Sequence, residues 1–273
     1  MNHDKRNINK KVAYSLTVAL IATIFLGFYI YKWEYRKPIL EIHFFSLNRG
    51  RSVFIRTPGN KTILVGGGQN SEVIREITKV NPFYSRSIDY VIIPSATQTQ
   101  IGGLLEILDR YSVGEIIMPK ITATSTVLMQ LLNKVHKKKI HIEKVERGDE
   151  IKIGDGVNDG LNRDLKISIL FPIRDFKYNK TSLPELGLEI VYKNTNAYLL
   201  GNLSKTIQKY IFRNMELNSS KKDSENIIEF YNSAIESKVS AELLEKINPK
   251  FIFSTREATI HFVSDGEGWK KIK

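Results

Sequence analysis

Four polar side chains follow one short apolar run of the chain. Ser95, Thr97, Thr99 and Gln100 come directly after the β-branched residues 91–93, and no histidine or carboxylate stands among them. Hydroxyl and amide groups could provide a serine nucleophile or weak oxygen ligands. Because no base lies near Ser95 in the sequence, catalysis there would need a base from a distant part of the chain. The absence of cysteine excludes disulfides, thiolate zinc sites and thiol chemistry.

The polar loop stands where a strand is expected to give way to a helix. Residues 87–93 end in a run typical of a strand buried on both faces, and residues 102–108 begin an apolar helix. Functional sites of open α/β sheets lie at such carboxyl ends of strands. The loop is therefore the first candidate for a site.

This arrangement resembles the metallo-β-lactamase fold, and in particular the globular domain of DNA-uptake competence proteins of the ComEC type. There the same strand leads into His-x-His-x-Asp-His followed by Ile-Gly-Gly, and Ile101, Gly102 and Gly103 stand here in that last place. The resemblance implies an αββα sandwich that binds metal. It also places the histidines and the aspartate on residues that are neither: Ser95, Thr97, Thr99 and Gln100.

Three further family segments keep glycine and lose acid or histidine. Residues 46–51, ending in Gly50 and Arg51, stand for Asp-Val-Gly-Gln-Gly-Asp, and residues 65–68 stand for the end of Leu-Ile-Asp-Gly-Gly. The bridging aspartate of Thr-Gly-Asp becomes Asn202, and residues 231–234, with Asn232, replace His-His-Gly-Ser. Tight turns and close backbone approaches favour glycine. The pattern predicts a degenerate domain without a cofactor, in which no zinc is expected.

Two functional interpretations follow. A domain without metal ligands cannot lower the pKa of a bound water for hydrolysis, which favours a catalytically inactive protein that acts by binding. The alternative is an active hydrolase with a relocated site, using Ser95 or the carboxylates of Asp149, Asp155 or Asp159. A calcium site at residues 155, 159 and 164 does not fit the EF-hand template.

The amino-terminal part predicts a membrane anchor. Residues 12–31 carry no charge over a length that suits one transmembrane helix. Residues 1–11 form a basic tail with four Lys or Arg, against three that follow the span, which favours a cytoplasmic tail and a domain outside the cytoplasm.

The domain itself is expected over residues 39–273. Strands are predicted at 40–44, 52–56 and 61–65 as a meander, and strands and helices then alternate to residue 143, which implies parallel strands covered by helices. A hairpin at 188–192 and 197–201, a helix at 205–215, a strand at 226–230, a helix at 240–247 and strands at 250–254 and 259–263 follow. Residues 174–184 are predicted to form a polar insertion.

Charge and histidine content bear on partners. The net charge of +12 leaves +7 outside residues 1–37, which suits an anionic partner such as DNA bound without sequence preference. A protein partner at the membrane is the other expectation. Only five histidines are present, and the alternation around His261 predicts a solvent-facing strand residue. The anion contacts would come from the basic end of helix 124–138, at Lys134, Lys137, Lys138 and Lys139.

Overall fold

Residues 14–29 form a helix whose side chains are all exposed, and they belong to a unit, residues 1–37, separate from residues 38–273. The computed structural model describes residues 14–29, 38–81, 84–120, 125–154, 163–172, 185–213, 224–230, 239–256 and 258–272. The predicted span 12–31 is thus described over 14–29. Among the described helices, none combines the length and apolar character that crossing a membrane requires.

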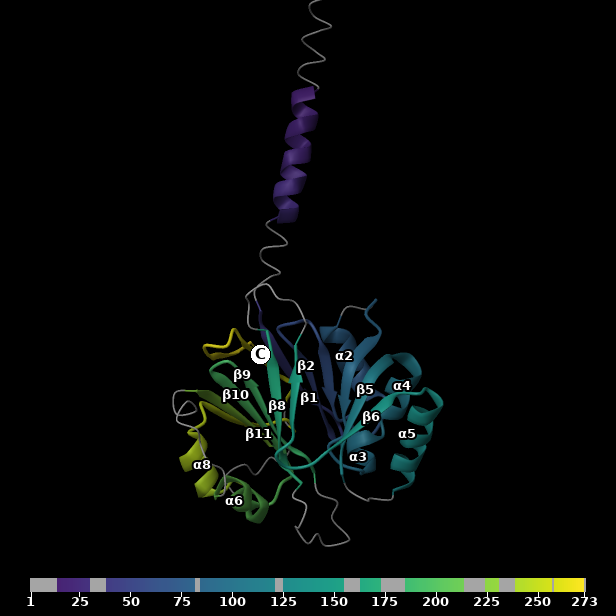
Figure 1. Cartoon of the computed structure of the whole chain (residues 1–273), viewed down its shortest axis with the longest axis vertical. Coiled ribbons are helices and arrows are strands. Elements are labelled where there is room, and N and C mark those ends of the chain that lie inside the picture. The colour runs from purple at the N-terminus through teal and green to yellow at the C-terminus, as the bar shows by residue number, and fades with distance from the viewer. Residues whose placement is uncertain are drawn as a thin grey trace, which may run out of the picture. The chain divides into compact units, whose positions relative to one another are not determined.

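The first sheet of the domain has eight strands, in the order β14-β13-β1-β2-β3-β4-β5-β6 (Figure 1). The strands β1 to β3 pair antiparallel, which confirms the predicted meander, and β3, β4, β5 and β6 are parallel neighbours. Their bounds are β1 Leu40–Ser46, β2 Arg51–Arg56, β3 Thr62–Val65, β4 Ser87–Ile92, β5 Ser112–Pro119, β6 His141–Val145, β13 Ile260–Ser264 and β14 Trp269–Lys271.

The second sheet has six strands, in the order β12-β11-β10-β9-β8-β7. The strands β9 and β10 form the predicted hairpin, with a tighter turn than expected, at Lys193 and Asn194. The strands β10, β11 and β12 are parallel. The bounds are β7 Glu150–Ile153, β8 Leu165–Phe171, β9 Gly187–Tyr192, β10 Thr195–Gly201, β11 Glu225–Phe230 and β12 Phe251–Ser254.

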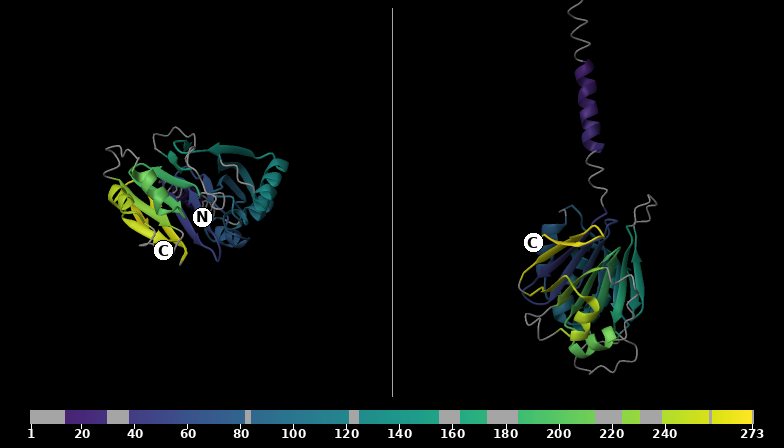
Figure 2. Two further views of the ribbon diagram at one scale, coloured as in Figure 1. Left: turned by 90° about the horizontal axis from the view of Figure 1, so that it is seen from below. Right: turned by 90° about the vertical axis from the view of Figure 1, so that its left-hand side faces the viewer.

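Helices cover the outer face of each sheet, and the two sheets pack face to face. Figure 1 and the views of Figure 2 show α4 and α5 on one side of the domain and α6 and α8 on the other. One apolar cluster lies between the sheets, and one more lies beneath the helices of each side. This is the expected αββα sandwich. The helices are α2 Glu72–Val80, α3 Gln98–Ile101, α4 Leu104–Arg110, α5 Thr126–Lys137, α6 Lys205–Arg213 and α8 Ala241–Ile247.

The apolar helix predicted to begin at residue 102 differs from the structure in one informative way. It starts at Leu104, and the preceding turn is a separate short helix, α3, which contains Thr99 and Gln100. Gly103 separates the two because its backbone lies against Gly67: a Cβ on Gly103 would come within 2.1 Å of the Gly67 carbonyl oxygen. The polar loop therefore packs closely against the glycine turn that follows β3.

The predicted insertion 174–184 and the aspartates 155 and 159 lie outside the described residues.

Candidate functional site

A buried arginine lies at the centre of the candidate site. Arg51 is the first residue of β2, and it stands where the resembled family has the last aspartate of its first segment. Its side chain is 1% exposed. The guanidinium Nε donates to Glu185 Oε1 at 2.6 Å, and Nη1 donates to Glu229 Oε2 at 2.5 Å. A cation is thus held between two carboxylates.

The backbone before β9 positions Glu185. The Leu186 amide donates to the Pro94 carbonyl at 2.7 Å, which fixes the start of β9 against the polar loop. Glu185 then accepts bonds from two of the family-site positions. Gln100 Nε2 donates to its Oε1 at 3.2 Å, and the Asn202 backbone amide donates to its Oε2 at 2.9 Å.

Glu229 is fully buried on β11. Thr255 Oγ1 donates to Glu229 Oε1 at 3.2 Å, and the backbone of Gly201 also bonds to this carboxylate. Gly201 is required here, because a Cβ on it would lie 2.6 Å from Arg51 Nη2 and 2.4 Å from Glu185 Oε1. The bulge at the end of β10 therefore closes over the ion pairs.

The electrostatics of the group favour a fixed positive charge. Burial opposes ionisation of Arg51, but Glu185 and Glu229 outweigh it and raise the pKa of Arg51 above its ordinary value. Burial also raises the pKa of Glu229, against the lowering effect of Arg51. The cluster holds one cation against two carboxyl groups, so it has no excess of positive charge with which to attract an anion.

The sequence-predicted site residues divide into three groups. Gln100 and the backbone of Asn202 join the ion pairs, although the side chain of Asn202 is exposed. The hydroxyls of Ser95, Thr97 and Thr99 form a chain of hydrogen bonds. Ser95 Oγ lies 3.1 Å from Thr97 Oγ1, and Thr97 Oγ1 lies 3.3 Å from Thr99 Oγ1. The Ser95 hydroxyl also accepts a bond from the Thr97 amide at 3.3 Å. Asn232 lies outside the described residues.

The residues present do not fit the two-metal group of the resembled fold. Their donors are hydroxyls, a carboxamide and two carboxylates already bound to a guanidinium. In the described part of the chain, Arg51 Nη2 and Gln100 Oε1 are buried without a hydrogen-bond partner. An arginine cation beside the ligand positions would repel a divalent ion, and none of the family-site residues described supplies a neutral imidazole to hold one.

The structure places the surface residues singled out from the sequence in different surroundings. Lys134 lies in a part-exposed ion pair, in which its Nζ bonds the Asp109 carboxylate and donates to the Leu105 carbonyl at 3.1 Å. Lys137, Lys138 and Lys139 are exposed as expected. His261 is only partly exposed, and not the fully solvent-facing residue that the strand alternation predicted. Its Nε2 is buried, and its ring stacks on His43 with centroids 3.9 Å apart, because the two residues pair across β1 and β13.

The sequence held a signal for part of what was missed. A glutamate inside the apolar run of residues 226–230 is unusual in a buried strand, and Arg51 replaces an acid of the resembled segment. Together these two anomalies indicate a buried ion pair. Glu185, next to a polar insertion, carried no comparable signal.

The comparisons with known proteins agree with the fold. No family model matches the chain, and no curated protein matches it. Among solved structures, the metallo-β-lactamase fold protein YhfI from Bacillus subtilis superposes with a TM-score of 0.51 at 9% identity, over 83% of this chain and 100% of that chain. Unliganded yeast PDE1 superposes with a TM-score of 0.50 at 10% identity, over 80% of this chain and 88% of that chain. The E377D mutant of the CmlA β-hydroxylase superposes with a TM-score of 0.49 at 14% identity, over 79% of this chain and 45% of that chain.

The fold and the similarity to YhfI and PDE1 define the architecture. The domain has the metallo-β-lactamase fold, in which two sheets are packed between helices. At identities this low the similarity concerns architecture, and function must be argued from the site.

Proposed function

We propose that this chain is a membrane-anchored, catalytically inactive domain of the metallo-β-lactamase fold, related to the globular domain of ComEC-type competence proteins, and that it acts through binding. The observation that carries the proposal is the ion-paired Arg51. Its guanidinium bonds the same carboxylate, Glu185, as Gln100 and the Asn202 backbone, which match family ligand positions.

The ion pair supplies a physical reason for inactivity. Metal hydrolases of this kind use the ion to generate hydroxide at neutral pH and to polarise the substrate. Arg51 has a positive charge but no open coordination position, and its Nε and Nη1 are already committed to Glu185 and Glu229. A permanent cation of this type can hold the sheets and loop together, while it cannot activate water.

The test is hydrolysis by the full chain with added Zn²⁺, Mn²⁺ or Fe²⁺. We expect no turnover of a chromogenic phosphodiester or ester above that of the Gln100→Ala and Thr97→Ala variants. Two metal equivalents per chain whose binding is weakened by Gln100→Ala, or a turnover abolished by it, would contradict the proposal. Turnover lost only in Ser95→Ala would instead support the relocated hydrolase.

The anchor part of the proposal rests on residues 12–31. The run has no charge, and the described helix over 14–29 exposes apolar side chains such as Leu16, Phe25 and Phe28. We expect the full chain to stay with membranes after alkaline extraction. A chain released by that treatment would not be anchored by this segment.

The binding partner is proposed at the level of class. A protein partner in an envelope complex suits a domain held at a membrane outside the cytoplasm, and non-specific DNA suits the exposed Lys137, Lys138 and Lys139. Crosslinking in cells, followed by identification of the crosslinked material as protein or DNA, separates the two. A chain that crosslinks to neither would overturn the binding role.

A further inference from the structure

A second group of ionisable side chains lies on β1 and β13, on the face of the first sheet that carries the helices. His43 of β1 and His261 of β13 are directly opposite each other in the antiparallel register. Glu41 lies two residues before His43, and residues two apart in a strand share a face. The sheet therefore brings two imidazoles and a carboxylate together, although only five histidines exist in the chain.

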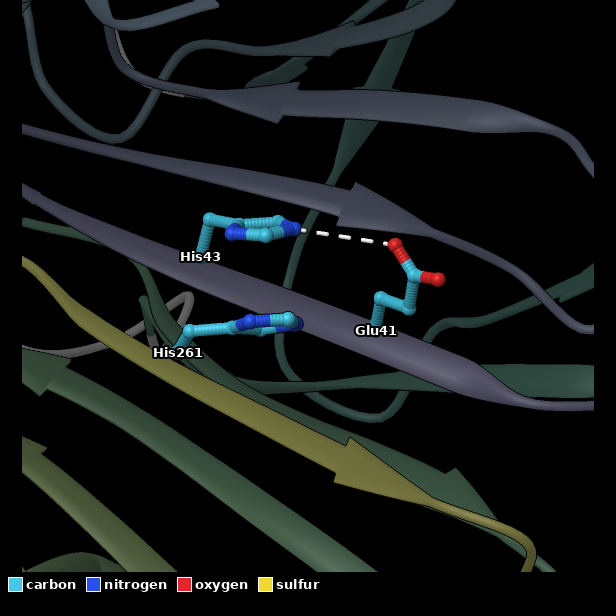
Figure 3. Close-up of side chains that lie close together, drawn as sticks. All are labelled: Glu41, His43 and His261. Carbon is cyan, nitrogen blue, oxygen red and sulfur yellow. Dashed lines mark ion pairs between the residues drawn. The ribbon is translucent and has the colours of Figure 1, made fainter. Parts of the chain in front are cut away.

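Figure 3 shows the two rings stacked, with Glu41 beside their nitrogen-bearing edges. The ring planes meet at 21°, and His43 Nε2 lies 3.6 Å from Glu41 Oε2. His43 is 7% exposed. The Nε2 atom of His261 is buried and has no hydrogen-bond partner among the described residues. Leaving a buried polar atom unpaired costs roughly 1–3 kcal/mol.

We propose that His43, His261 and Glu41 form a binding site for a divalent transition-metal ion such as Zn²⁺. One ligand atom from each residue can be chosen so that all lie within 4.8 Å of one another. Tetrahedral zinc at bond lengths near 2.05 Å needs ligand atoms about 3.4 Å apart. The ligand atoms must therefore approach one another by up to about 1.4 Å, which rotation of one imidazole out of the stack can supply.

The ligand chemistry suits zinc. Two imidazoles and one carboxylate form a ligand set that proteins use for this ion, with a fourth position left to water. A metal here would satisfy the unpaired Nε2 of His261.

Arg56 is the competing cation. It pairs with Glu41 across β1 and β2, and its Nη1 lies 3.1 Å from Glu41 Oε2, the same oxygen that faces His43. Its Nη2 is held independently by the Val80 carbonyl at 2.9 Å and by Asn81 Oδ1 at 3.3 Å. Glu41 can turn its other oxygen to a metal while Arg56 keeps these contacts, so the guanidinium can orient the carboxylate.

This site is separate from the degenerate one. The expectation of no zinc was derived for the family positions, from residues 95–100 and 202, whereas His43 and His261 face the helix side of the first sheet. A zinc ion bound here would leave the proposed inactivity of the Arg51 cluster unaffected.

The experiment uses the full chain without a polyhistidine tag, stripped with a chelator and then titrated with Zn²⁺, and with Co²⁺ as a spectroscopic probe. We expect one equivalent of Zn²⁺ and a Co²⁺ absorption spectrum typical of tetrahedral coordination. Loss of an outer-shell partner costs about 10–100-fold in affinity, so His261→Gln and Glu41→Gln should each weaken binding by at least that factor.

The matched control is His141→Gln. His141 lies 3.5 Å from Glu115, which reproduces one imidazole beside one carboxylate without a second imidazole. Its replacement should leave zinc affinity unchanged. Thermal melting in the absence of metal shows whether each variant folds. Positions 41 and 261 are chosen for substitution because they are partly exposed, whereas a His43→Gln variant at a buried position could fail to fold. No zinc binding by the unaltered chain, or binding that survives both His261→Gln and Glu41→Gln, would overturn the proposal.

Discussion

Arg51 joins elements that lie far apart in the sequence. A guanidinium offers several hydrogen-bond donors in one plane. Here two of its nitrogens bond the carboxylates of Glu185 and Glu229, which come from two different parts of the chain. Glu185 precedes β9, Glu229 lies on β11, and Arg51 itself starts β2 in the other sheet. The charge therefore links the two sheets at the edge where the polar loop lies.

Removing the cation should be costly. Arg51→Met would leave two buried carboxyl groups without their partner, and breaking a buried pair in this way costs about 3–5 kcal/mol. At roughly 2–4 °C per kcal/mol, the melting temperature should fall by about 6–20 °C. Thermal melting followed by circular dichroism measures it.

The control for this prediction lies two residues away. Arg49 is exposed, so Arg49→Met should change stability by no more than about 0.5 kcal/mol. The double variant Arg51→Met, Glu229→Gln should recover part of the stability, since it removes one uncompensated charge. Equal melting temperatures for Arg51→Met and Arg49→Met would mean that the ion pairs contribute nothing to stability.

The buried hydroxyl of Tyr192 is expected to make the stability of the domain depend on pH in the alkaline range. Burial, with a further contribution from Asp265, raises the pKa of Tyr192 to about 12, and its hydroxyl donates to the Pro38 carbonyl at 2.9 Å. Below pH 10 the folded and the unfolded chain both keep the proton. Between about pH 10 and 12 only the unfolded chain loses it, so the free energy of unfolding falls by about 2–3 kcal/mol over that window.

Denaturant unfolding at pH 9 and pH 11.5 tests this expectation. Tyr192→Phe should show a smaller decrease between the two pH values than the unaltered chain, whereas Tyr84→Phe, at a 75% exposed position, should show the same decrease. If Tyr192→Phe and the unaltered chain lose stability equally, the raised pKa of Tyr192 is wrong.

At the scale of elements, a glycine turn fixes the polar loop. Gly50 has φ of +84°, and a Cβ there would lie 1.6 Å from the Thr99 carbonyl oxygen. The turn before β2 and the short helix α3 therefore touch backbone to backbone. This contact also brings Arg51 and Gln100 to the same carboxylate.

Gly148 offers a matched comparison. It has φ of +93°, but a Cβ added to it would meet no atom within 4 Å, so Gly148→Ala should cost only the backbone strain, about 1–2 kcal/mol. Gly50→Ala should cost at least about 1–3 kcal/mol more, as forced overpacking does. Chemical denaturation measures both variants. Equal decreases in stability would show that the loop and the turn are not tightly packed.

Most of the elements could be predicted from the sequence, for a physical reason. Runs such as Lys61 to Val65 and Ile88 to Ile93 combine β-branched residues with turn residues at their ends, and these local signals survive folding. The boundary at Gly102 and Gly103 was missed, because the break between α3 and α4 results from contact with Gly67 and not from local preference. The tight turn at Lys193 was missed for a similar reason.

The site was only half predictable. The mismatch between the loop from Ser95 to Gln100 and the motif of the resembled family could be seen in the sequence, because it depends on residue type alone. The buried ion pairs depend on Arg51, Glu185 and Glu229, and more than a hundred residues separate Arg51 from Glu185. The pairing of His43 with His261 likewise depends on strand register, which places β13 beside β1.

At the scale of the molecule, the net positive charge leads to a prediction about DNA. Affinity for phosphate through dispersed lysines arises mainly from counterion release and should fall steeply with salt. We expect the full chain to retain DNA of any sequence at low ionic strength. Reversal to Glu of Lys137, Lys138 and Lys139 should weaken retention, and it should lower the salt slope by about 1 for each lysine that binds a phosphate.

The control carries the same change of charge elsewhere. Lys144, Lys270 and Lys271 are exposed on other elements, and their reversal to Glu should weaken DNA retention less than reversal at the end of α5. Equal effects of both triple variants would indicate attraction by net charge without a surface. No retention by the unaltered chain at low salt would remove DNA as a partner.

The order of strands in the first sheet also has a consequence for biosynthesis. β1 lies between β2 and β13. β1 is the first strand of the domain to be synthesised and β13 is one of the last, so one edge of β1 stays unpaired until β13 has been made. Phe44, on β1, packs against Phe253 and Phe262, which leave the ribosome after nearly all other elements. A nascent chain would expose this edge and this apolar face throughout translation, and exposed strand edges readily pair with other chains. The domain therefore has to complete its folding after synthesis, and stalled or shortened chains that lack β13 should depend on chaperones to stay monomeric.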